Sequence, residues 1–270
     1  MAMDQAHDDA QMGFLDHLEE LRRRLFISAA AILAGGIGLF VAKDWVFDIV
    51  LFGPRNPEFV SYRAWCALSH AIGSGEALCV DRISYELINT TMLGNFSAHI
   101  IVSAVGGLIL AFPVVIHQVW AFVRPAMKQG ERSAARGAGL ASSVLFMLGV
   151  AFGYFGIATL SLQFLGHYEL GDVSARIAVM SYVKTVASIT LAAGLIFQLP
   201  VLIFFLSKAG LVTADGLKSY RKHALVGILA LSAVITPPDV TSQVLVSLPV
   251  LLLYEMGIWI ARRQDKRRAS

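Results

Sequence analysis

Long, uninterrupted apolar runs constrain this chain more than any other feature of its sequence. The hydrocarbon core of a bilayer holds no water, so a crossing segment must satisfy its own backbone, and a helix needs roughly 20 mainly apolar residues to cross. The 270 residues are 56% hydrophobic and only 15% charged, whereas about a quarter of an average soluble domain is charged. The sequence therefore predicts an all-α integral membrane protein.

Six runs are candidate transmembrane helices. They cover residues 25–42, 98–123, 139–165, 182–206, 223–235 and 241–261. The fifth and sixth are short, and the fifth implies local thinning of the bilayer or shelter by neighbouring helices. The acidic start of the chain lacks the basic region of a cleaved signal peptide, so we expect the first run to be retained. We expect one membrane domain, 14–263, between a polar tail, 1–13, and a basic tail, 264–270.

The positions of the basic residues predict the orientation. Most of the 22 lysines and arginines precede the first span, follow the sixth, or lie between spans two and three and between spans four and five. The positive-inside rule then places both termini in the cytoplasm. The first outside segment, about 43–97, is long and holds the only two cysteines, Cys66 and Cys79. A disulfide between them would stabilise the fold by about 3 kcal/mol, and two free thiols remain the alternative.

The motifs of common enzymes are absent from the sequence. It contains no HExxH, no GxxxxGK[ST] and no GxSxG, so neither a metalloprotease, a P-loop ATPase nor a hydrolase is indicated. His99 and His117 are 18 residues apart in one expected span, hence about 27 Å apart along a helix, which is too far to share a metal. We expect no enzyme, no metal, no cofactor and no nucleic-acid partner.

Residues 14–26, "FLDHLEELRRRLF", predict an amphipathic helix that lies near the membrane interface before turning into the first span. Phe14, Leu18, Leu21 and Leu25 share its apolar face. The simplest explanation of its acids is that Glu20 pairs with Arg24 four residues later, as Glu19 does with Arg23, which adds a few tenths of a kcal/mol to the helix.

A second acid stands among basic residues after the second span. Glu131 lies beside Arg132 in the loop that follows Pro125. Together with Glu20 it could form one cytoplasmic site for a cationic ligand, or it could be a solvated loop residue that balances Arg132. The residues alone leave both interpretations open.

Several longer motifs resemble one known family in combination and in order. They are "FLDHLEELRRRL", "AFPVVIHQVWAFVRPAMKQGER", "FMLGVAFGYF", "GLIFQLPVL", "GLVTADGLKSYRKHALV", "TPPDVTSQ" and "LPVLLLYEMGIWIAR". The chain resembles the TatC family, the polytopic receptors of the twin-arginine protein translocase. The resemblance covers nearly all of 14–263 except the long outside segment. It implies six spans with cytoplasmic termini.

The resemblance implies a receptor for signal peptides that carry two adjacent arginines. It assigns contact with those arginines to Glu20 and Glu131, since a carboxylate can hold a guanidinium by a bidentate, charge-assisted pair. The motif positions that would support this site are Arg22, Leu25, Phe122, Pro125 and Arg132.

The fourth span departs from the family pattern. Many members carry a glutamate before the proline of "FExP", whereas this chain reads "FQLP", with Gln198 before Pro200. A glutamine can bind a partner's polar group without a charge, or it can satisfy a carbonyl freed by the proline. On the outside, Pro54 and Asp239 match family positions of structural importance, and the turn at Asp239 is also explained as a simple chain reversal.

The resemblance further implies single-span partners of the TatA and TatB type, a multimeric complex in the bacterial cytoplasmic membrane, and transport driven by the proton-motive force. The rival function is a secondary transporter of a small solute, which would gather polar groups near the midplane of two related halves. Gln198 beside Pro200 is a weak instance of such a group, but no internal repeat relates the halves.

Overall fold

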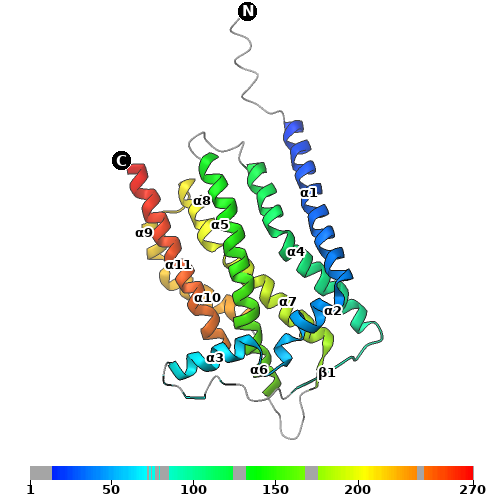
Figure 1. Cartoon of the computed structure of the whole chain (residues 1–270). Helices are drawn as coiled ribbons and strands as arrows, with labels where there is room; N and C mark the ends of the chain where they lie inside the picture. Colours follow the sequence, from blue (N-terminus) through cyan, green and yellow to red (C-terminus); the bar gives the residue numbers. More distant parts are fainter. Residues whose placement is uncertain are drawn as a thin grey trace, which may run out of the picture.

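The computed structural model describes residues 14–71, 73, 75, 76, 79, 85–123, 132–167, 176–235 and 240–269, in which long helices run side by side as a bundle (Figure 1). In chain order the elements are α1 (Phe14–Val41), α2 (Lys43–Trp45), the π-helix η2 (Val46–Leu51), the 3-10 helix η3 (Gly53–Arg55), α3 (Val60–Ala71), β1 (Glu86–Ile88), α4 (Gly94–Val123), α5 (Arg132–Ala151), the π-helix η6 (Phe152–Ala158), α6 (Thr159–His167), β2 (Arg176–Ala178), α7 (Val179–Ile196), α8 (Leu199–Lys208), α9 (Ala214–Ser219), α10 (Arg221–Ile235) and α11 (Val240–Ala269).

Four helical segments within the described residues are long and apolar enough to cross a membrane. They are His17–Val41, Gly94–Val123, Gly137–His167 and Val179–Lys208. They correspond to the first four expected spans. The expected fifth and sixth spans correspond to α10 and α11, which pack against each other and against α7 and α8. The count of six spans stays a prediction.

Helix α1 is continuous from Phe14 to Val41. The expected turn between the amphipathic start and the first span is therefore wrong, and the position of that start near the interface stays a prediction. The physical reason lies in the sequence, because no glycine or proline occurs between Phe14 and Ala34, and sharp helix kinks almost always arise at such residues or at inserted bulges. Its amphipathic start therefore continues directly into the apolar run.

The fourth expected span is divided in two. α7 ends at Ile196, and α8 begins at Leu199 with Pro200 in its first turn. Proline lacks an amide hydrogen and its ring clashes with the preceding turn, so a helix is interrupted just before it. The interruption leaves Gln198 at the junction between α7 and α8.

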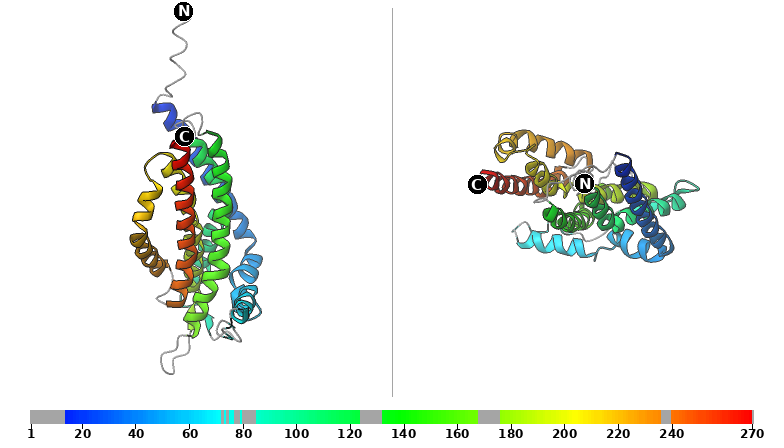
Figure 2. Two further views of the ribbon diagram at one scale, coloured as in Figure 1. Left: turned by 90° about the vertical axis from the view of Figure 1, so that its left-hand side faces the viewer. Right: turned by 90° about the horizontal axis from the view of Figure 1, so that it is seen from above.

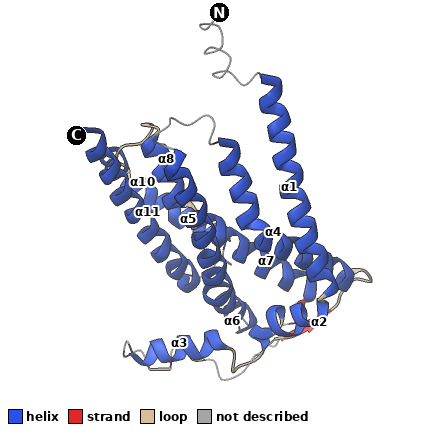
Figure 3. Cartoon of the chain, turned by 45° about the horizontal axis from the view of Figure 1, so that its top comes forward, coloured by secondary structure: helices blue, strands red, loops and turns tan. Residues whose placement is uncertain are grey.

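The end of the bundle opposite the start of α1 carries α2, α3 and the two short strands (Figures 1 and 3). There α3 lies across the bundle, and β1 pairs in parallel with β2, Glu86 opposite Arg176. This two-stranded sheet departs from a purely helical expectation. Its strands are three residues each, too short for the sequence pattern to reveal.

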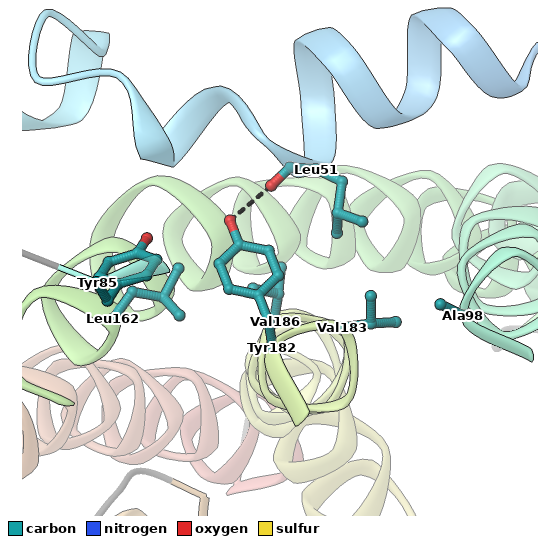
Figure 4. Packing of buried hydrophobic residues seen from close by; sticks show 7 residues of the cluster. All are labelled: Leu51, Tyr85, Ala98, Leu162, Tyr182, Val183 and Val186. Atoms are coloured by element: carbon teal, nitrogen blue, oxygen red, sulfur yellow. Dashed lines mark hydrogen bonds between the residues drawn. The ribbon is translucent and has the colours of Figure 1, made fainter. Parts of the chain in front are cut away.

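Tyrosine hydroxyl groups donate hydrogen bonds to backbone carbonyls of the segment between α2 and α3. Tyr182 of α7 donates to the carbonyl oxygen of Leu51 at 2.6 Å, within a buried apolar cluster (Figure 4). Tyr62 of α3 donates to the carbonyl oxygen of Pro54 at 2.8 Å, and Tyr154 of η6 donates to that of Val50. These bonds satisfy carbonyls in a segment that leaves regular α-helical geometry. Pro54 itself is buried.

Candidate functional site at the start of helix α1

The start of α1 meets the last turns of α4 through a polar contact. Arg24 donates from Nε to Glu20 Oε1 at 3.0 Å and also from Nη2 to the same oxygen. Its third donor, Nη1, reaches Oε1 of Gln118 on α4 at 3.3 Å. The expected pairing of Glu20 with Arg24 is confirmed. Arg24 therefore holds the carboxylate on α1 and ties α1 to α4.

Glu20 keeps one oxygen for another donor. Both bonds from Arg24 end on Oε1, and no described residue donates to Oε2. The side chain of Glu20 is 22% exposed, so an incoming cation can reach it while solvent screening is reduced. A second guanidinium bound at Oε2 would form a charge-assisted hydrogen bond beside the existing one.

Aromatic rings pack beside this carboxylate. The imidazole of His17 on α1 stacks on the ring of Phe122 on α4, with centroids 4.4 Å apart. This contact places Phe122 at the same end of the α1 and α4 pair as Glu20. The guanidinium of Arg22 lies 5.6 Å from the ring centroid of Phe26, and Leu25 is 66% exposed. Arg22 and Leu25 therefore lie on the surface of α1, and neither makes a described polar contact with Glu20.

Glycines set how closely α1 and α4 approach. A Cβ on Gly107 of α4 would lie 2.5 Å from the backbone nitrogen of Gly36 and 2.8 Å from the carbonyl oxygen of Ile32. A Cβ on Gly35 would lie 3.1 Å from the carbonyl oxygen of Gly107. Small residues of this kind let the backbones of two membrane helices come into contact. This crossing brings Arg24 within reach of Gln118.

The second acid of the expected site is outside this geometry. Glu131, Pro125 and Asp239 lie outside the described residues, and Arg132 begins α5 with its side chain likewise outside the description. α4 is described up to Val123. The expected meeting of Glu20 with Glu131 stays a prediction.

Gln198 makes a contact between helices. Its amide nitrogen donates to the carbonyl oxygen of Ser142 on α5 at 3.0 Å. The acceptor is thus a carbonyl of another helix, and the alternative in which Gln198 serves a carbonyl freed by Pro200 is wrong. This hydrogen bond joins the α7–α8 junction to α5. An ionised glutamate at position 198 could not make it, because a carboxylate has no hydrogen to donate.

Cys66 and Cys79 are joined by a disulfide that links α3 to the segment after it. His70, one turn after Cys66 on α3, places Nε2 at 3.8 Å from Sγ of Cys79. Burial raises the pKa of the nearby Tyr62 to about 12, because the charged phenolate loses its solvation there. Tyr62 is therefore neutral and able to donate at physiological pH.

Sequence reasoning missed His17, Gln118 and the tyrosine hydroxyl groups. The chain offers a partial signal for Gln118, because an amide near the end of an apolar span needs a polar partner. Which partner it finds depends on how α1 packs on α4. The spacing of residues within either helix does not predict which residue of α1 lies opposite Gln118.

Comparison with known proteins gives one consistent family. The family model of the Sec-independent protein translocase protein TatC matches residues 16–249. The TatC protein of Blattabacterium sp. subsp. Periplaneta americana is 33% identical over 264 residues, which cover 96% of this chain and 98% of that protein. The TatC protein of Aquifex aeolicus is 34% identical over 260 residues, with 95% and 98% covered.

The fold is similar to crystal structures of the twin arginine translocase receptor TatC. One matches with a TM-score of 0.67 and 33% identity, covering 92% of this chain and 99% of the other. The structure of that receptor in DDM matches with a TM-score of 0.70 and 33% identity, covering 91% and 99%. The similarity therefore extends over almost the whole length of both chains.

Proposed function

Because this chain belongs to the TatC family of Sec-independent protein translocase proteins, we propose that it is the receptor that binds the twin-arginine signal peptide of folded cargo at the start of α1. The observation that carries the proposal is Glu20, which is partly buried, held by Arg24 and left with one carboxylate oxygen to which no described residue donates. A site of this kind suits a planar cation that brings its own fork of donors.

The proposed topology has six spans with both termini in the cytoplasm. The spans are α1, α4, α5 with η6 and α6, α7 with α8, α10 and α11. Support comes from the bundle itself, since the start of α1 and the end of α11 lie at the same end of it (Figure 1). The basic residues of 262–268 also follow the apolar part of α11 directly, as expected for a cytoplasmic end. The domain limits 14–263 belong to the same proposal.

The signal peptide's two arginines are proposed to bind one acid each. The first guanidinium joins Arg24 on the carboxylate of Glu20, and the second is taken by Glu131. Each charge-assisted hydrogen bond is worth about 1.5–3 kcal/mol, less where solvent screens it. Arg22, Leu25, Phe122, Pro125 and Arg132 would surround the peptide, and its apolar part would insert beside the spans.

The remaining proposals concern assembly and energy. Single-span partners of the TatA and TatB type would pack against the later spans, including the short α10, and Gln198 offers a polar group at the α7–α8 junction for a partner. The working unit would be multimeric in the bacterial cytoplasmic membrane and would act without turning over a small molecule. Transport would draw on the proton-motive force, which supplies about 2.3 kcal/mol per charge per 100 mV.

The test is capture of a synthetic twin-arginine signal peptide by the purified full-length chain in lipid nanodiscs. We expect capture of the Arg–Arg peptide and loss of capture when both arginines become lysines, because an ammonium lacks the planar fork of N–H donors that a guanidinium presents. Uptake of a labelled solute into proteoliposomes by this chain alone, without peptide capture, would instead support the solute transporter and overturn the proposal.

A further inference from the structure

A second surface lies at the same end of the bundle, between α5 and α11, which run side by side (Figure 2). A cleft of about 420 Å³ separates them, and α8 packs on both. Its walls are almost wholly apolar. The apolar residues that line it include Ala138 and Ala141 of α5, Pro200 and Phe204 of α8, and Met256 and Trp259 of α11.

The mouth of this cleft is basic. The apolar part of α11 ends at Ala261, and Arg262, Arg263 and Lys266 follow. Arg263 lines the cleft, and its guanidinium carbon lies 3.5 Å from the ring centroid of Trp259. None of the described residues that line the cleft is acidic. A guanidinium stacked on a ring keeps its in-plane N–H groups free to bind an anion.

The acid nearest along the chain is engaged elsewhere. Asp265 Oδ2 accepts the backbone N–H of Ala214 at 2.9 Å, which fastens the start of α9 to α11. That carboxylate is therefore hydrogen-bonded to α9, and among the described residues no ion pair joins an acid to Arg262 or Arg263. An apolar cleft with arginines at its mouth is complementary to a molecule with an apolar chain and an anionic head.

We propose that this cleft binds an anionic phospholipid of the leaflet at that end of the bundle, with one acyl chain between α5 and α11 and the phosphate on Arg263. Basic pockets between membrane helices on the cytoplasmic side bind such headgroups, and arginine binds phosphate in a bidentate way. Arg262 and Lys266 add positive charge around the headgroup.

The size of the cleft favours a lipid chain over a partner helix. A helix with its side chains is about 10–12 Å wide and rises 5.4 Å per turn, so one turn occupies roughly 500 Å³. The cleft, at about 420 Å³, holds less than one turn. A single hydrocarbon chain is much narrower than a helix, and Ala141 of α5 and Met256 of α11 both line the cleft that it would occupy.

The test is photolabelling of the purified full-length chain in nanodiscs with a phosphatidylglycerol that carries a diazirine in one acyl chain. We expect labelled peptides from α5 and α11, and much weaker labelling by a phosphatidylcholine with the same chains. Arg263→Gln should lower labelling about fivefold, since one basic residue contributes about 1 kcal/mol at an anionic surface. Ala141→Phe should lower it by filling the cleft while every charge remains.

Lys222→Gln is the matched control, because Lys222 is an exposed cation on α10 that does not line the cleft. It should leave labelling unchanged. Equal labelling by the two lipids, or labelling that Arg263→Gln does not reduce, would overturn the proposal. So would a photoreactive residue at position 141 that captures a single-span protein in cells rather than lipid.

Discussion

Gly107→Ala should push α1 and α4 apart and destabilise the protein. The new Cβ would lie 2.5 Å from the backbone nitrogen and 2.7 Å from the Cα of Gly36, and 2.8 Å from the carbonyl oxygen of Ile32. All three are backbone atoms, so no side chain can rotate away. Ordinary contact begins near 3.4 Å, so the helices must separate by about 0.9 Å, the difference between 3.4 and 2.5 Å.

The expected cost follows from this displacement. Overpacking of a close-packed interface typically costs about 1–3 kcal/mol. Against it stands the gain of up to about 1 kcal/mol from replacing glycine by alanine within a helix. Gly38→Ala on α1 isolates the steric part, because a Cβ at Gly38 would meet nothing within 4 Å. The two variants share the propensity gain, and only Gly107→Ala creates the clash.

The assay is thermal unfolding of the two variants and the unaltered chain in the same detergent. Gly107→Ala should melt lower than Gly38→Ala by about 2–4 °C for each kcal/mol of clash. It should also weaken signal-peptide binding, because separation of the helices moves Gln118 away from Arg24. Equal melting temperatures for the two variants would refute the reasoning about the α1–α4 crossing.

Three further predictions concern stability. Replacing Cys66 and Cys79 together by serine should cost about 3 kcal/mol, because the bridge closes a loop with a sequence separation of 13; freely alkylated cysteines in non-reduced, unaltered protein would contradict this. Gln198→Glu should become less stable as pH rises, because only the protonated acid can donate to the Ser142 carbonyl; melting temperatures that do not change with pH, or that match those of Gln198→Leu, would argue against that bond. The unaltered protein should lose stability as pH rises from about 10 to about 12, because Tyr62 loses its proton at a lower pH in the unfolded chain than in the folded one. Tyr62→Phe should weaken this loss when unfolding is measured over a series of alkaline pH values. An unchanged pH profile in that variant would speak against the burial of Tyr62 as the cause.

Those features that depend on one segment at a time could be predicted from the sequence. The apolar runs predict the second, third and fourth long helical segments to within a few residues, because the length and hydropathy of a span are local properties. The first segment begins at His17 rather than at residue 25. The pairing of Glu20 with Arg24 is equally local, being one turn of one helix. The break before Pro200 was not predicted, since the fourth span was expected to be continuous, although proline chemistry accounts for it.

Features that depend on how segments meet could not be predicted. The contact of Gln118 with Arg24 joins residues 94 positions apart, and it exists because glycines allow one particular crossing. The hydrogen bonds from Gln198 to the carbonyl of Ser142 and from Tyr182 to the carbonyl of Leu51 likewise join residues that are far apart in the sequence. The turn expected after the amphipathic start of α1 was wrong because an apolar stripe alone does not distinguish a helix lying on a membrane from one entering it.

The central claim is that Glu20, with Glu131, binds the two arginines of the signal peptide. The most direct test is the equilibrium affinity of a fluorescent twin-arginine peptide for the nanodisc-embedded chain and for Glu20→Ala, Glu131→Ala and the double variant. Glu19→Ala is the matched control, an exposed acid one position away on the same helix. We expect each single variant to lose about tenfold or more, since one bond to a charged group is worth about 1.5–3 kcal/mol, and the double variant to bind no better than a Lys–Lys peptide binds the unaltered chain. Unchanged affinity in a double variant that is folded and inserted would contradict the account.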